Sequence, residues 1–288
     1  MTTPTLKELA SLITQQNHPI SFSMLEIGGR PIGDSQEPFY ALLDAFPGSQ
    51  IFGFEVDLKT CDELNANSKP GVTFFPSALG AKEEYRVFYE ANHPMCGSLF
   101  QPNDEFNRLY NNLEVAFLKS TSSIETVSLD YFSMKNKIGD IDFIKIDIQG
   151  AELDVFRGGI ETLEEVLMVV SEVMFVPHYI NTPLFGDVSS FLSSRGLMYH
   201  KFLGTGGRAL TPIILGNDVN LPSQHIWSDA VFIRHVLSIP KLSPEKLLKL
   251  GVLSLIYNSP DLTYYCLKHF DNLQGSKLHE DFIKLIGN

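Results

Sequence analysis

The sequence has few cysteines, no long apolar run and no excess of basic residues, and each shortage excludes a class of protein. Its three cysteines, Cys61, Cys96 and Cys266, lie far apart without paired spacing, so we expect neither a disulfide framework nor a structural zinc site. No stretch approaches the roughly eighteen apolar residues that a membrane span needs. The polar, helix-like start does not have the pattern of a signal peptide. We therefore expect a cytoplasmic protein that does not bind a membrane.

The charge balance is acidic. The 288 residues contain 34 Asp and Glu against 22 Lys and Arg, a formal net charge of −12. This excess argues against a protein that binds nucleic acid, because such binding depends on clustered basic side chains. Hydrophobic residues make up 44% of the chain and charged residues 19%, which is typical of a globular protein rather than a disordered one.

Strand and helix patterns alternate through the first 75 residues. Short apolar runs predict buried strands, and the stretches between them have helical spacing. Such alternation is typical of a parallel sheet with crossover helices on its faces. The strands are expected at 22–27, 50–55 and 72–75, and the helices at 5–15, 36–46 and 58–67.

The same pattern returns after a less regular middle region, and helices alone follow residue 240. We divide the chain into an N-terminal cap helix (1–19), a main α/β domain (20–236) and a C-terminal helical extension (237–288). The extension is very apolar, and it either caps the sheet or forms a homo-oligomer interface. Further strands are expected at 84–89, 127–130, 143–148, 166–173, 197–203 and 230–233. Further helices are expected from 151 with a break at 158–159, and at 185–194, 243–257, 261–270 and 279–286. A loop is expected at 93–103, and a long loop or hairpin rim at 204–228.

The first candidate site is the glycine turn after the strand at 22–27. Gly28 and Gly29 would let the backbone approach a ligand closely, but neither G-x-G-x-x-G nor a Walker pattern is present. Instead Glu26 precedes the first glycine by two residues. A carboxylate there disfavours a phosphate and favours a cationic ligand. An ordinary strand–turn–helix junction is the alternative interpretation.

Glu55 is the second candidate, because it ends the next strand 22 residues after Gly33. An acid at about this distance binds the ribose hydroxyls in nucleotide-binding α/β folds. A glycine turn and a ribose acid suit either NAD or S-adenosylmethionine. The missing phosphate motif and the acid inside the turn favour S-adenosylmethionine, which carries a sulfonium and an ammonium but no phosphate. A solvated strand-end carboxylate is the plain alternative.

The third candidate is the strand around Lys145 and Asp147. These two side chains share one face by period-two alternation, and Asp147 lies at the carboxyl end where ligands bind in open parallel sheets. A lysine inside an apolar strand needs a charge partner. We expect that partner to be Glu172, at the end of the following strand. A buried ion-pair network that only fixes the strand ends is compatible with this view.

These segments resemble one known family. The stretch KIDIQGAELDVFRGG (145–159) is similar to the strand-four motif of the FkbM family of S-adenosylmethionine-dependent methyltransferases. The resemblance covers about 20–235 and implies a Rossmann-like class I fold, with a mostly parallel seven-stranded sheet, helices on both faces and the C-terminal helices as an appendage. It extends to LEIGG (25–29), FGFEVD (52–57), Gly-Ser-Leu (97–99), VSLDYF (127–132), Ser171-Glu172 and DAVFIR (229–234).

The resemblance also implies roles for single residues. Glu26, Gly28 and Gly29 would line the methionine part of the cofactor, and Glu55 would hold the ribose. Ser77 and Ala78 would lie by the adenine, and Ser98 matches a small hydroxyl position near the cofactor. Two positions depart from the family pattern. Gly-Gly-Arg-Pro replaces the common Gly-Ala-Asn in the first turn, and Gln149 stands where a Glu is usual.

Methyl transfer to oxygen needs an in-line approach and gains from a base that takes the hydroxyl proton. Asp147 is the first candidate on the acceptor side, as a base or an orienting group, and His178 is the second. No metal is expected, because no cluster of His and carboxylate residues requires one, but a metal bound by Asp147 and Glu172 stays an open alternative. We predict an O-methyltransferase for a hydroxyl of a sugar, glycan or small natural product. Two alternatives stay open: a non-catalytic cofactor-binding or scaffold protein with the same fold, and a nicotinamide oxidoreductase.

Overall fold

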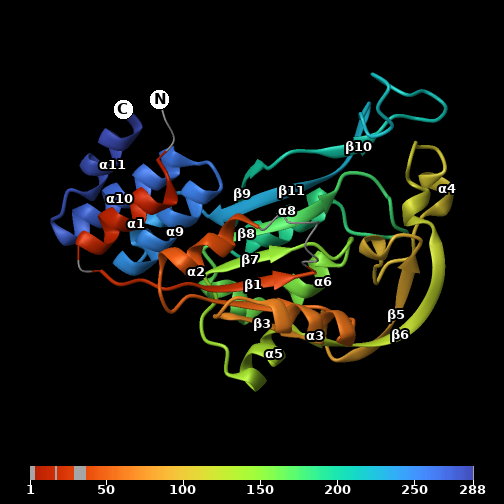
Figure 1. Cartoon of the computed structure of the whole chain (residues 1–288), viewed down its shortest axis with the longest axis horizontal. Coiled ribbons are helices and arrows are strands. Elements are labelled where there is room, and N and C mark those ends of the chain that lie inside the picture. Colours follow the sequence, from red (N-terminus) through yellow and green to blue (C-terminus); the bar gives the residue numbers. More distant parts are fainter. Residues whose placement is uncertain (1–3, 17, 29–36, 288) are drawn as a thin grey trace.

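A large, mostly parallel sheet forms the centre of the computed structural model (Figure 1), which describes residues 4–16, 18–28 and 37–287. The strands follow the order β10-β11-β8-β7-β1-β2-β3, and β9 also pairs with β11. All pairs among β1, β2, β3, β7 and β8 are parallel, which confirms the mostly parallel sheet. The strands are β1 (Ser23–Ile27), β2 (Gln50–Phe54), β3 (Val72–Phe75), β7 (Phe143–Ile146), β8 (Met168–Met174), β9 (Leu197–Phe202), β10 (Gly206–Arg208) and β11 (Gln224–Arg234).

In the described residues this sheet has eight strands, not the seven that the sequence predicted. β9 pairs with residues 230–234 of β11, and β10 pairs with residues 224–227 along the same edge. One edge position is thus shared by two short strands with a break between them. Gly204, with φ +122°, lies in this break. The extra strand, β10, pairs antiparallel with the start of β11 within the region 204–228, which was predicted as a long loop or hairpin rim.

A smaller sheet lies beyond the carboxyl ends of the parallel strands (Figure 1). It consists of β4 (Ala78–Gly80), β6 (Leu118–Ser128) and β5 (Glu84–Ala91), in the order β4-β6-β5. The strand predicted at 84–89 is β5. The prediction of a short strand at 127–130 was wrong, because 127–128 end the much longer β6 and a helix begins at Leu129.

Four helices cover one face of the main sheet. They are α5 (Leu129–Asn136), α6 (Glu152–Arg157), α7 (Ile160–Glu165) and α8 (Phe185–Ser194), and their apolar side chains join Leu25, Ile144 and Val169 in one core cluster. The predicted break between α6 and α7 is present. A Cβ atom on Gly158 would lie 2.3 Å from the carbonyl oxygen of Gly80, so α6 can approach the smaller sheet only with a glycine there.

The other face is covered by helices from both ends of the chain. These are α1 (Leu6–Gln15), α2 (Ala41–Ala45), α9 (Pro244–Ile256), α10 (Pro260–Gln274) and α11 (Leu278–Gly287), which share a second core cluster with Met24, Phe143 and Val170. Tyr257 stacks on Phe143, and Lys249 pairs with Asp142 at 3.0 Å. The C-terminal helices are therefore a layer on the sheet rather than an appendage. A domain division at residue 237 stays a prediction.

Apart from the 10-residue helix at 58–67, the remaining helical segments are short. The stretch predicted as a helix at 36–46 is divided into a 3-10 turn and α2, and residue 36 lies outside the described residues. No helix in the described ranges has the length and apolar character needed to cross a membrane. The other elements are α3 (Leu58–Asn67), α4 (Asp104–Asn107), η1 (Pro38–Tyr40), η2 (Pro94–Cys96), η3 (Glu114–Ala116) and η4 (Ile239–Lys241).

Candidate functional site

The carboxyl ends of β1 and β7 approach each other closely at Gly28. The φ of Gly28 is +81°, and a Cβ atom there would lie 2.0 Å from the carbonyl oxygen of Asp147. The backbone N–H of Asp147 donates to the carbonyl of Ile27 at 2.9 Å. Only glycine fits this junction, because any side chain would push the two strand ends apart. The junction brings Asp147 next to the end of β1.

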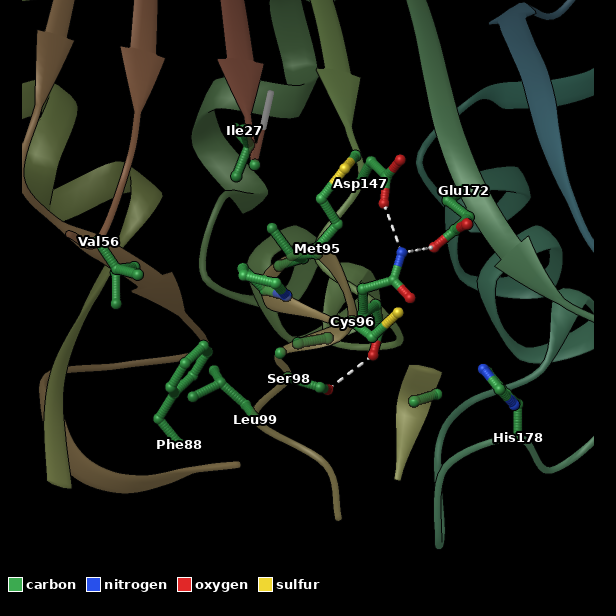
Figure 2. Close-up of a pocket in the computed structure, with 18 of the residues that line it drawn as sticks. Ile27, Val56, Phe88, Met95, Cys96, Ser98, Leu99, Asp147, Glu172 and His178 are labelled. Atoms are coloured by element: carbon green, nitrogen blue, oxygen red, sulfur yellow. Dashed lines mark hydrogen bonds between the residues drawn. The ribbon is translucent and has the colours of Figure 1, made fainter. Parts of the chain in front are cut away.

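A cavity of about 370 Å³ lies at this edge of the sheet (Figure 2). Its size is that of a small-molecule site. Apolar side chains make up much of the wall, with Val56 and Phe88 at one end of Figure 2 and Glu172 and His178 at the other. The charged, hydroxyl, amide and imidazole side chains of the lining are Glu55, Ser77, Ser98, Asp147, Gln149, Glu172, His178 and Arg208.

Most of the residues predicted from the sequence meet in this cavity. Those that line it are Gly28, Glu55, Ser77, Ala78, Ser98, Asp147 and His178. Gly29 lies outside the described residues. Glu55 is buried, and one of its carboxylate oxygens accepts the backbone N–H of Asp57 at 2.9 Å. The cavity therefore joins elements that are far apart in the chain but end at one edge of the sheet.

Glu26 does not belong to the cavity lining, although the sequence placed it there. The β1 alternation turns it to the same face as Met24 and Lys145, and the hydroxyl of Tyr40 donates to its carboxylate. Burial raises the pKa of Glu26 to about 7, against the opposing effect of that hydrogen bond. Glu26 thus ties β1 to the chain just before α2, behind the wall of the cavity, and its contact with a ligand stays a prediction.

Gln149 connects the two acidic residues of the central strands. Its side-chain amide donates to Asp147 at 2.9 Å and to Glu172 at 2.8 Å, and its carbonyl oxygen accepts from the hydroxyl of Tyr179 at 2.9 Å. The Ser98 hydroxyl donates to the backbone carbonyl of Gln149 at 2.6 Å; dashed lines in Figure 2 mark the bonds at Asp147, Glu172 and Ser98. A neutral amide can donate to both carboxylates, whereas a Glu here would add a third acid.

Burial and neighbouring acids raise the pKa values of two buried carboxyl groups, Glu172 and Glu152. The Glu172 pKa is raised well above its ordinary value, first by burial and then by Asp147 and Glu152. Glu152 begins α6 and lies under the loop after β7, where it accepts the backbone N–H groups of Ile148 at 2.9 Å and Gly150 at 3.1 Å. Burial raises its pKa to about 7. Glu152 fixes the loop that presents Gln149.

Lys145 pairs with Asp229 rather than with the expected Glu172. The distance from its Nζ to the Asp229 carboxylate is 2.8 Å. Asp229 lies directly opposite Glu172 in the β11–β8 register, so both acids are on the face of Lys145. Nearby acids raise the pKa of Lys145 although burial opposes this. The lysine stays charged, and the pair joins β7 to the antiparallel β11.

His178 lies in the loop after β8 and is 4% exposed. Its Nδ1 is 2.6 Å from the Oδ1 of Asn107, and the Asn107 amide donates to the His178 carbonyl at 3.3 Å. Burial and, to a lesser degree, the charge of Arg208 together lower the pKa of His178 to about 4. The imidazole is therefore neutral at pH 7.

Trp227 contacts two other residues of the cavity lining, His178 and Arg208, which come from different parts of the chain. The indole and imidazole rings stack with centroids 6.2 Å apart, and the Arg208 guanidinium carbon is 5.1 Å from the indole centroid. Trp227 is a partly buried residue of β11 and lies opposite Met174, while Arg208 ends β10. Sequence reasoning missed Trp227, Arg208 and Asn107, because the short elements and strand start that carry them lie in segments without a periodic pattern.

The cavity is acidic without a metal-ligand set. In the described part of the chain, no group of three or more His, Cys, Asp and Glu residues could hold a metal ion. The acids at the strand ends suit a positively charged group of an organic ligand, and the neutral histidine suits a hydroxyl group.

Comparison with known proteins finds similar sequences among methyltransferases. A sequence model described as the methyltransferase FkbM domain matches residues 28–199. The 2-O-methyltransferase NoeI of Sinorhizobium fredii (strain NBRC 101917 / NGR234) is 28% identical over 175 residues, which are 58% of this chain and 67% of that protein.

Two solved structures have a weaker likeness. The crystal structure of methyltransferase FkbM from Methylobacillus flagellatus KT gives a TM-score of 0.39 at 13% identity, covering 78% of this chain and 47% of that one. A putative methyltransferase from Thermoplasma acidophilum gives 0.33 at 11% identity, covering 75% and 70%. The chain thus spans about half the length of the first structure, and these low scores add nothing to the family match.

Proposed function

The chain belongs to the FkbM family of methyltransferases, and from this premise we propose that it transfers a methyl group from S-adenosylmethionine to a hydroxyl oxygen. The acceptor would be a sugar, a glycan or a small natural product. The observation that carries the proposal is one cavity with carboxylates at the strand ends and a neutral histidine at its far side. The relative NoeI, named a 2-O-methyltransferase, supports oxygen as the acceptor atom.

The donor end fits a sulfonium nucleoside. Carboxylates attract its sulfonium and ammonium charges, while the one cationic side chain of the described lining, Arg208, lies over Trp227 and not beside Glu55 at the end of β2. Glu55 would hold the ribose hydroxyls, and Ser77 and Ala78 would lie by the adenine. Gly28 and Asp147 would border the methionine part. When bound, the donor supplies an electrophilic methyl carbon, so the protein contributes mainly position.

His178 would accept the proton of the acceptor hydroxyl. Because the Asn107 amide nitrogen donates to the His178 carbonyl, the Asn107 oxygen faces Nδ1 and accepts its hydrogen. The hydrogen is then on Nδ1, and Nε2 carries the lone pair. With a pKa of about 4 the imidazole is a weak base, so we expect the proton to leave as the oxygen–methyl bond forms. Asp147, fixed by Gln149, would orient the ligands.

Calorimetric titration with S-adenosylmethionine tests the donor site. We expect the wild type to bind, and Glu55→Gln to bind at least about tenfold more weakly, since a hydrogen bond to a charged group contributes about 1.5–3 kcal/mol. The exposed Glu63, on α3, provides the control variant Glu63→Gln, which should bind like the wild type. Equal affinity of Glu55→Gln and the wild type would contradict the assignment.

Turnover tests the reaction itself. Release of S-adenosylhomocysteine is measured with a broad panel of hydroxylated sugars, phenols and hydroxy acids. Methylation of an oxygen in any of them supports the proposal. Binding of S-adenosylmethionine without turnover on the whole panel would instead favour the non-catalytic cofactor-binding protein that the sequence left open.

A further inference from the structure

Arg208 gives the cavity a second kind of charge. Among the described residues that line the cavity it is the one lysine or arginine, while three lining residues are acids. Its charge acts on His178 and on Cys96, so the guanidinium lies toward the His178 side of the cavity. Glu55 lies at the end of β2, on the other side of the sheet centre. The cavity is thus divided into an acidic donor side and a side with a cation.

The hydrogen-bonding capacity of Arg208 is largely unused within the described chain. Nη1 donates to the neighbouring carbonyl of Gly207 at 2.7 Å, and no ion pair links the guanidinium to a described carboxylate. Nε is buried and has no hydrogen-bond partner there. A guanidinium has five N–H donors in a planar fork that matches a carboxylate or phosphate. A buried donor without a partner costs free energy, which an anionic ligand would offset.

The position of this fork is fixed in advance. Arg208 lies over the Trp227 ring, and Trp227 stacks in turn on His178. Stacking on an aromatic ring restrains the guanidinium plane, so little entropy is lost when an anion binds. The same indole ring contacts both the arginine and the histidine that would take the hydroxyl proton. An anion on Arg208 would therefore lie near the reacting oxygen.

We propose that the acceptor carries an anionic group, a carboxylate or a phosphate ester, near the hydroxyl that is methylated, and that Arg208 binds this group. The inference rests on the proposed methyltransferase function and names its substrate class. Hydroxylated sugar acids, sugar phosphates and hydroxybenzoates all have this chemistry. The anion positions the acceptor, and the hydroxyl then points to His178.

Matched pairs of probes test the inference in the full-length protein saturated with S-adenosylhomocysteine. Saturation-transfer NMR measures the binding of glucuronate against glucose, glucose 6-phosphate against glucose, and 4-hydroxybenzoate against its methyl ester. We expect the anion of at least one pair to bind about 10- to 100-fold more tightly than its neutral partner, the range of one hydrogen bond to a charged group. The pairs that respond separate a carboxylate site from a phosphate site.

Arg208→Gln should remove this preference and leave the affinity for S-adenosylmethionine unchanged. Arg195→Gln is the matched control, because Arg195 also lies over an aromatic ring, Phe191, but is exposed and does not line the cavity. The inference is overturned if no anion binds better than its neutral partner, or if Arg208→Gln keeps the preference. Methylation of neutral acceptors alone would overturn it while the methyltransferase function stands. Failure to bind S-adenosylmethionine would reject that function itself.

Discussion

Asn107 and His178 hold each other through two contacts across 71 positions of the chain. One contact joins Oδ1 of Asn107 to the imidazole Nδ1, and the other joins the Asn107 amide nitrogen to the backbone carbonyl of His178. A single side chain thus fixes both the loop after β8 and the tautomer of the ring. Asn107 is a positioning residue in the proposed reaction, because it acts on the acceptor only through His178.

Replacing Asn107 should change the tautomer of His178 without changing donor binding. In Asn107→Leu the Nδ1 hydrogen has no acceptor, so we expect a mixture of tautomers in the nitrogen-15 spectrum of the ring, with signals assigned by His178→Gln. Turnover should fall about 100- to 10,000-fold in His178→Gln, the usual contribution of an acid–base group, and less in Asn107→Leu.

The control for Asn107 is Asn67→Leu at an exposed position of α3. It should leave the His178 spectrum, turnover and the affinity for S-adenosylmethionine unchanged. A wild-type spectrum that shows the hydrogen on Nε2, or an unchanged ring spectrum in Asn107→Leu, would refute the positioning role.

Glu152 should make the wild type less stable as the pH rises. Its pKa is about 7 in the folded protein and 4.5 without the fold, so the unfolded chain loses the proton first. The free energy of unfolding therefore falls by an amount on the order of 3 kcal/mol between about pH 4.5 and 7, and it is level above pH 7.

Glu152→Gln keeps an oxygen that accepts the loop N–H groups but removes the titration. Urea unfolding should show the variant gaining stability over the wild type at pH 8 relative to pH 5. The exposed Glu63→Gln should show no such gain, and a gap between wild type and Glu152→Gln that is the same at both pH values would contradict the assignment.

The C-terminal helices should unfold together with the sheet. Leu250 on α9 is fully buried in the cluster that includes Phe143 and Val170. Leu250→Ala should lower the free energy of unfolding by about 2–5 kcal/mol, the cost of a leucine-sized cavity. Leu237→Ala, at a side chain that is 76% exposed, should cost far less. Circular dichroism and tryptophan fluorescence, which reports Trp227 in the sheet, should give one coincident transition. Two separate transitions would show the helices to be an independent appendage.

The sequence predicted elements best where local signals define both ends. The helices at 58–67 and 185–194 have the predicted bounds, and Asp57 caps the first of them by accepting the backbone N–H of Thr60 at 2.7 Å. β6 was missed over most of its length because its side chains are mainly polar and exposed, so no alternation marks it. β10 lies where a long loop or hairpin rim was predicted, and its bounds could not be predicted because Gly-Gly-Arg is typical of a loop.

The candidate site was predictable where strands supply it. Parallel strands end at a common edge, so Glu55 and Asp147 could be expected to share one site before the structure was known. The ion-pair partner of Lys145 could not be predicted from the sequence, because it depends on which residue of the antiparallel β11 lies opposite Glu172. Asn107 and Arg208 come from segments whose positions depend on long-range contacts alone.

β9 and β10 share one edge of the main sheet, so a sequence change at this edge can be separated from a change in the inner parallel strands. Arg208 belongs to the three-residue β10, which is held at the rim by its pairing with β11 and is not bordered by another strand on its outer side in the described chain. Replacement or lengthening of this rim segment would leave the inner parallel strands and their glycine junction intact. A change in this rim segment would thus alter the Arg208 side of the cavity, while the half of the cavity built on the inner strands stays as it is.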